Sequence, residues 1–78
     1  MEILFSKNAK KSILSLDKKF YERVLNAIEN IPAGDIKPLK NYSSAYRLRV
    51  GDYRVLYTLK EDILKIDDIL PRGSAYKK

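Results

Sequence analysis

The chain has 78 residues, a net charge of +6, and neither cysteine nor histidine. These absences exclude disulfides, thiolate chemistry and imidazole-based catalytic triads, and they argue against a conventional zinc site. Hydrophobic residues make up 45% of the chain, which is too many for a disordered protein, so we expect one small globular domain over residues 1–78.

The first elements are a short strand and a helix. Residues 1–5 form an apolar run with strand character, and Ser6 is a residue type that commonly caps a helix N-terminus. Ala9 and Ile13 follow at a spacing that places them on one helical face. The pattern therefore predicts a first helix over residues 7–15.

A second, longer helix follows. Asp17 is a candidate N-cap, and apolar residues recur at helical spacing over residues 18–31. Pro32 and Gly34 end this helix, because proline cannot continue the hydrogen-bond ladder and glycine releases the chain. Residues 35–44 are rich in turn-forming types, so we expect them to form a connection without regular structure.

The stretch from Ala45 to Tyr57 predicts a β-hairpin folded about Gly51 and Asp52. Its side chains alternate with period two, which places successive residues on opposite faces of a sheet. Folding the two strands about this turn predicts one continuous apolar face. That face consists of three cross-strand pairs, which are Val50 with Tyr53, Leu48 with Val55, and Tyr46 with Tyr57.

The opposite face of the hairpin carries arginines. The same register places Arg49 directly across from Arg54, with Arg47 beside them. Like charges directly across a sheet are destabilising, so this cluster predicts that an anion completes the site. Arginine is the side chain suited to bidentate phosphate contact, although a basic surface alone is only a weak pointer to nucleic acid. The alternative interpretation is an ordinary solvated sheet face.

Residues 63–70 predict a third consecutive strand. Leu64, Ile66 and Leu70 share a face, but Asp68 shares it too, and the pattern does not decide whether a bulge interrupts the strand near Asp67 and Asp68. The element order is β-α-α-β-β-β. It predicts an α+β fold with an antiparallel sheet of about four strands, both helices on one face, and the arginines on the open face.

Three segments together resemble the RelE side of the RelE/ParE toxin superfamily. They are Asp35 to Lys40, the hairpin from Tyr46 to Val55, and Leu70-Pro-Arg72 followed by Tyr76. The resemblance implies a RelE-like toxin of a type II toxin–antitoxin system, with an antitoxin, the ribosome and messenger RNA as partners. Toxins of the RelE branch cleave messenger RNA in the ribosomal A site without a metal or cofactor. The implied products are a 2′,3′-cyclic phosphate and a free 5′-hydroxyl.

The resemblance also implies the site residues. Catalytic roles carry over onto Arg47, Arg49, Arg54, Arg72 and Tyr76, and candidates for RNA contact are Lys40, Lys77 and Lys78. The implied reaction passes through a negatively charged phosphorane, which guanidinium groups can stabilise. Guanidinium stays protonated and cannot transfer protons, which leaves Tyr76 as the candidate for that role. The chain departs from the best-known members in having arginines where they place lysines on the first hairpin strand. It also lacks the histidine that some relatives use.

Two other functions stay open. One is a ParE-like inhibitor of DNA gyrase, although ParE-like chains usually lack the C-terminal arginine and tyrosine that Arg72 and Tyr76 supply here. The other is a catalytically inactive member that only binds its antitoxin. No apolar run approaches the roughly 18 residues that cross a bilayer, and no secretory signal is apparent, so a cytoplasmic protein is expected.

Overall fold

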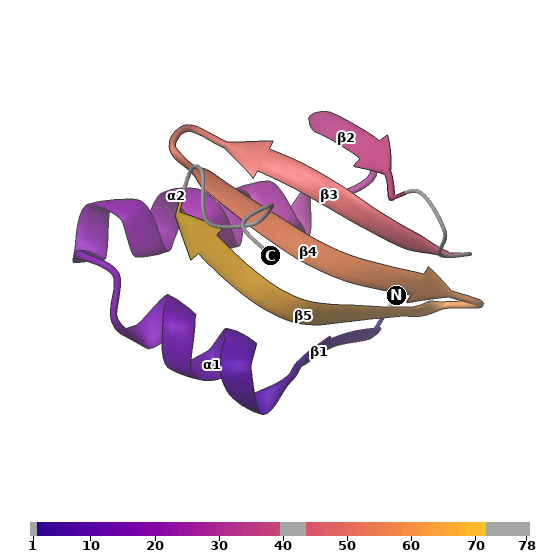
Figure 1. Cartoon of the computed structure of the whole chain (residues 1–78), viewed down its shortest axis with the longest axis horizontal. Helices are drawn as coiled ribbons and strands as arrows, with labels where there is room; N and C mark the ends of the chain where they lie inside the picture. The colour runs from indigo at the N-terminus through magenta and orange to yellow at the C-terminus, as the bar shows by residue number, and fades with distance from the viewer. Residues whose placement is uncertain (1, 40–43, 72–78) are drawn as a thin grey trace.

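The computed structural model describes residues 2–39 and 44–71, which form two helices and a five-stranded sheet of order β1-β5-β4-β3-β2 (Figure 1). The elements in chain order are β1 (Glu2–Phe5), α1 (Lys7–Leu14), α2 (Lys18–Glu29), β2 (Asp35–Pro38), β3 (Ala45–Val50), β4 (Tyr53–Lys60) and β5 (Ile63–Pro71). The predicted α+β class is confirmed. Within the described ranges, neither helix is long and apolar enough to cross a membrane.

Both predicted helices form, and each ends slightly before its predicted boundary. Ser6 is the N-cap of α1, since its hydroxyl accepts a hydrogen bond from the Ala9 amide at 3.0 Å. The same hydroxyl donates to the Asp67 carbonyl at 2.7 Å, which ties the start of α1 to β5. Asp17 precedes α2 as predicted, but its side chain makes no capping hydrogen bond.

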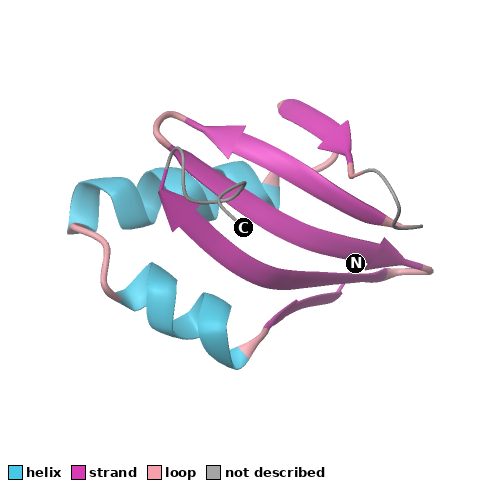
Figure 2. Ribbon diagram, in the orientation of Figure 1, coloured by secondary structure: helices cyan, strands magenta, loops and turns pink. Residues whose placement is uncertain are grey.

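The helices cover one face of the sheet and build a single hydrophobic core with it (Figure 2). Each helix contributes an apolar stripe, and the sheet contributes alternate residues of its three long strands. The buried set is Ala9 and Ile13 of α1, Val24 and Ile28 of α2, Ile31, and Leu48, Val55, Tyr57, Leu64, Ile66 and Ile69 of the strands. Because these alternate positions face the helices, the intervening strand residues occupy the opposite face.

The prediction of an irregular connection over residues 35–44 is wrong for its first part. Asp35–Pro38 form β2, which pairs antiparallel with β3 and adds an edge strand to the expected set. A segment this short, ending in proline, carries little local strand signal. An edge position tolerates proline because the missing amide would have faced solvent.

The first strand joins the sheet, but not in the expected antiparallel sense. β1 pairs parallel with β5, from Glu2 opposite Ile63 to Phe5 opposite Ile66. Parallel neighbours need a long connection, and here the helices and the rest of the sheet supply it. The sheet is therefore antiparallel except for this one pair.

A bulge interrupts β5 in the region that the sequence pattern did not decide. Tyr57 pairs with Ile66, whereas its neighbour Leu56 pairs with Asp68, so Asp67 has no cross-strand partner. The extra residue shifts the alternation by one position. This shift lets both Ile66 and Ile69 reach the core, which strict alternation would forbid. The prediction that Leu70 shares a face with Leu64 and Ile66 is wrong for the same reason, and Leu70 instead lies opposite Arg54.

Candidate functional site

The predicted cross-strand register of the hairpin is confirmed pair by pair. Arg49 of β3 lies directly opposite Arg54 of β4, and Arg47 lies opposite Leu56 on the next row. Arg47 and Arg54 are thus diagonal neighbours, at a separation that long side chains span. These three residues lie on the sheet face turned away from the helices, which is called the arginine face below.

The arginine face is less open than the sequence led us to expect. Arg49 is exposed and Arg54 is half-buried, but Arg47 is only 6% exposed. Arg47 lies in an inner row of the sheet, with Lys37 of β2 opposite it on one side and Leu56 of β4 on the other. The unforeseen edge strand therefore explains part of this burial.

The edge strand also brings a carboxylate to the arginine face. Asp35 lies opposite Arg49 in the sheet, and its carboxylate is 3.9 Å from the Arg47 guanidinium. Sequence reasoning missed this contact because it treated residue 35 as part of a connection. Four residues with one apolar side chain, Ile36, give too short a pattern to identify a strand from the sequence.

Other carboxylates lie beside the bulge of β5. The Thr58 hydroxyl donates to the Asp67 carboxylate at 2.7 Å, and the Ile69 amide donates to the Asp68 carboxylate at 2.8 Å. The Ser12 hydroxyl of α1 also donates to Asp68, at 3.3 Å. These bonds fix the bulge and link it to α1, so we assign these acids a structural role.

The remaining predicted site residues lie outside the described ranges. They are Lys40, Arg72, Tyr76, Lys77 and Lys78. Across residues 2–39 and 44–71, no group of three or more acidic side chains lies close enough together to hold a metal ion. What the described residues bring together is a cationic cluster on one sheet face, with the Asp35 carboxylate at its edge.

Comparisons with known proteins agree with this arrangement. The sequence profile described as "ParE toxin of type II toxin-antitoxin system, parDE" matches residues 3–76. Toxin RelE3 of Methanocaldococcus jannaschii is 30% identical over 84 residues, covering 97% of this chain and 96% of that toxin.

Solved structures match as well. The RelB-RelE antitoxin–toxin complex from Methanococcus jannaschii contains a chain with a TM-score of 0.78 and 30% identity, covering 94% of each chain. The archaeal RelE-RelB complex from Pyrococcus horikoshii OT3 gives a TM-score of 0.76 and 31% identity over 94% of this chain and 96% of that one. This chain therefore belongs to the RelE/ParE superfamily of type II toxin–antitoxin toxins.

Proposed function

We propose that this toxin is an endoribonuclease that cleaves messenger RNA on the ribosome and thereby inhibits translation. The observation that carries the proposal is the position of Arg49 directly across from Arg54, with Arg47 on the same face. Like charges directly across a sheet repel each other, and a phosphate bound between the two side chains would offset this repulsion. Guanidinium groups match phosphate in shape and charge, and the net charge of +6 favours a polyanionic substrate.

The proposed reaction is an in-line attack of a ribose 2′-oxygen on the adjacent phosphorus. The new bond joins the 2′-oxygen to phosphorus, and the bond from phosphorus to the 5′-oxygen breaks. The products are a 2′,3′-cyclic phosphate and a free 5′-hydroxyl. Arg47, Arg49 and Arg54 stabilise the negative charge that develops on the phosphorane, and each such preorganised group contributes about 10²–10³ in rate.

The two proton transfers need another group, because guanidinium stays protonated at any physiological pH. By the family resemblance we assign this role to Tyr76, with Arg72 completing the cationic set. Lys40, Lys77 and Lys78 are assigned to flanking RNA contacts. A well-placed proton-transfer group raises the reaction rate by about 10²–10⁴. Because this site has few such groups, its rate depends on how the substrate is oriented. The ribosome supplies that orientation in this proposal.

The proposed protein partner is a cognate antitoxin, met in the cytoplasm where the ribosomes are. Both archaeal RelE relatives were solved in complex with a RelB antitoxin. We expect the antitoxin to lay a helix or an extended segment over an apolar strip or over the arginine face. Acidic residues of that segment would neutralise the guanidinium cluster and block access of RNA.

A translating extract tests the nuclease. The wild-type protein should produce cuts in phase with codons, with cyclic phosphate ends. Arg54→Ala and Arg72→Ala should each lower the cleavage rate by about 10²–10³ without loss of fold. Lys18→Ala removes one exposed positive charge from α2, on the other side of the sheet, and serves as the matched control. Equal cutting by the wild type and the Arg54/Arg72 double variant would overturn the site.

A gyrase inhibitor is the second candidate, because the family profile that matches this chain is that of the ParE toxin. A supercoiling assay with purified gyrase separates the two functions. Loss of supercoiling while the messenger RNA stays intact would favour the ParE-like function. If neither activity is found, the chain is a binding module for its antitoxin.

A further inference from the structure

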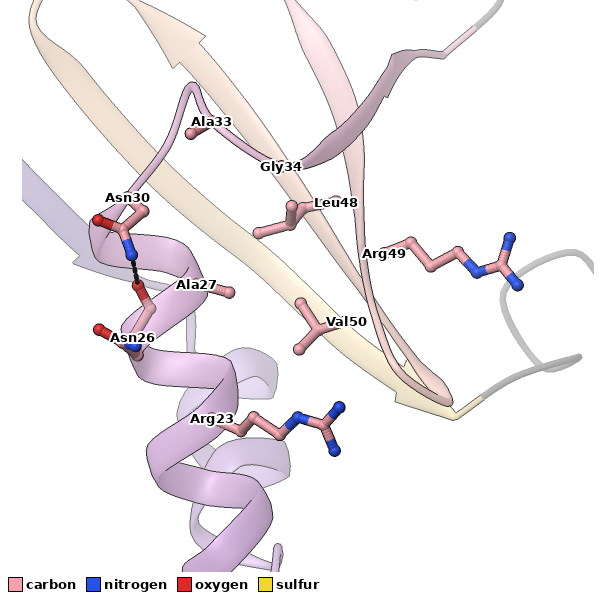
Figure 3. Close-up of a pocket in the computed structure, with 9 residues that line it drawn as sticks. All are labelled: Arg23, Asn26, Ala27, Asn30, Ala33, Gly34, Leu48, Arg49 and Val50. Atoms are coloured by element: carbon pink, nitrogen blue, oxygen red, sulfur yellow. Dashed lines mark hydrogen bonds between the residues drawn. The ribbon is translucent and has the colours of Figure 1, made fainter.

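A groove of about 410 Å³ lies beside β3 on the helix side of the sheet (Figure 3). Its floor is apolar, with Leu48 buried and Ala27 and Val50 half-buried, and its rim is polar and exposed. The polar rim residues from α2 are Arg23, Asn26 and Asn30. This volume falls within the range of roughly 300–1,000 Å³ that is usual for ligand pockets.

The groove and the arginine face meet at one end of β3. β2 pairs with β3 only from Tyr46 to Arg49, so β2 does not cover the edge of β3 at Val50. Arg49 contributes to the wall of the groove, while its guanidinium points away from α2 toward the opposite face of the sheet (Figure 3). An RNA strand lying over Arg49 and Arg54 can therefore continue around this strand end without crossing β2.

Arg23 of α2 lies beside the β3–β4 turn, where an RNA strand on this course would enter the groove. Three atoms of its guanidinium, Cζ and both terminal nitrogens, lie 3.9 Å from where a Cβ on Gly51 would be, so the planar group faces the hairpin turn. Within the described part of the chain, no carboxylate lies within ion-pair distance of Arg23. The turn thus holds an exposed cation whose other planar surface can stack on a base and whose N–H groups can bind a phosphate.

We propose that this groove binds one nucleotide of the RNA strand, next to the phosphodiester that lies over the arginine face. The inference rests on the proposed nuclease function and extends its substrate contacts to α2. An apolar floor suits the face of a base, and carboxamides at the rim both donate to and accept from base edges. The Arg23 guanidinium suits the phosphate of the same nucleotide or stacks on its base. An acidic peptide would satisfy the charge of Arg23 but would leave the apolar floor without a flat partner.

A binding experiment tests this inference without relying on catalysis. The nitrogen-15-labelled full chain is titrated with a short single-stranded RNA in which every 2′-hydroxyl is methylated, so that it cannot be cleaved. We expect amide shifts at Gly34 and Val50 and at the side chains of Asn26 and Asn30, together with shifts on the arginine face.

Two groove variants and one control variant test whether the groove itself contributes to RNA binding. Arg23→Gln should weaken binding about tenfold and lower the slope of log affinity against log salt by about 0.7, as expected for one phosphate contact on a single strand. Ala33→Phe, at an exposed residue that lines the groove, should weaken binding through bulk alone. Lys18→Gln removes the same charge from an exposed position of α2 outside the groove and should change affinity less than about twofold. Thermal melting confirms that each variant is folded.

The outcomes separate this inference from the proposed function. Shifts confined to the arginine face, or equal affinity of Arg23→Gln and wild type, overturn the groove while codon-phased cleavage still supports the nuclease. Groove shifts produced by a short glutamate peptide but not by the RNA identify a protein-binding groove and also overturn the inference. Groove shifts with the RNA in a chain that cleaves no message would support the RNA contact and overturn the nuclease alone.

Discussion

The Asp35 carboxylate of β2 lies 3.9 Å from the Arg47 guanidinium of β3, across the edge of the sheet. Asp35 is half exposed, whereas Arg47 is buried, so the contact anchors an inner arginine to an outer acid. It also places a negative charge beside the cluster that we assign to phosphate. The arginine face is therefore less cationic than its three guanidinium groups alone would make it.

Asp35→Asn should raise the affinity for the methylated RNA by about two- to fivefold, because it removes a charge that repels phosphate at a distance of several ångströms. The free energy of unfolding should change by less than about 1 kcal/mol, since one partner of the ion pair is well exposed to water. Glu2→Gln, an exposed acid of β1 at the opposite edge of the sheet, is the control. Weaker RNA binding by Asp35→Asn would show that the carboxylate is needed to hold Arg47 in a binding position.

Arg49→Thr should separate stability from activity. Replacing one member of the Arg49–Arg54 pair relieves cross-strand repulsion and should raise the free energy of unfolding by about 0.2–1 kcal/mol. The same change should lower RNA cleavage by about 10²–10³, because a phosphorane ligand is lost. Urea unfolding and cleavage in the extract measure the two effects.

Lys65→Thr, which removes a charge from the same sheet face without touching this pair, should change stability little and lower cleavage far less than Arg49→Thr does. A loss of both stability and cleavage in Arg49→Thr would assign Arg49 a structural role instead.

Leu48 should be essential to the core. It is 1% exposed and packs among the buried residues of both layers. Leu48→Ala should therefore lower the free energy of unfolding by about 2–5 kcal/mol. Leu48→Asp should leave the chain unfolded, because a small domain has little stability to lose. Circular dichroism with urea or heat measures both. Leu14→Ala makes the same chemical change at a residue that is 71% exposed, and its cost should be small.

Alkaline pH should destabilise the fold through Tyr57. Burial raises the pKa of Tyr57 above its ordinary value of 10.0, and the charge of the neighbouring Tyr46 phenolate raises it further. Because the folded chain keeps this proton longer than the unfolded chain does, the stability that depends on it is complete below about pH 10. That stability is lost as the pH rises through the raised folded pKa.

Tyr57→Phe keeps the aromatic packing against Tyr46, whose ring centroid is 5.4 Å away, and removes this titration. Urea unfolding between pH 8 and about pH 11 should therefore show a shallower alkaline loss of stability in the variant than in wild type. The same loss in both proteins would contradict the assignment to Tyr57. Tyr21→Phe on α2 is the control for removal of a tyrosine hydroxyl.

The hairpin shows how far a sequence pattern alone can go. Period-two alternation about Gly51 and Asp52 predicted the register, and the structure reproduces each predicted pair, including Arg49 with Arg54. Gly51 adopts a φ of +57°, which is the left-handed conformation that glycine takes at no steric cost in a tight turn. A tight turn fixes which residues of the two strands lie opposite each other, so the local sequence was sufficient to predict the register.

The two edge strands, β1 and β2, have pairings that a local sequence pattern does not predict. β2 is too short and too polar to be recognised by itself, and it exists because β3 offers it an unpaired row of backbone groups. The parallel partner of β1 likewise depends on how the helices return the chain to the sheet. Asp35 reached the arginine face only through this pairing, and so the contact with Arg47 was not predictable.

By itself, the sequence determined the helices, the hairpin register and the clustering of guanidinium groups on one face, because each follows from contacts between residues that are close along the chain. The tertiary structure alone decided the strand order, the placement of Asp35 beside Arg47 and the meeting of Arg23 with the hairpin turn. Those relationships join segments that are far apart in sequence. They form only when burial of the shared core brings the segments together, and no local periodicity records them.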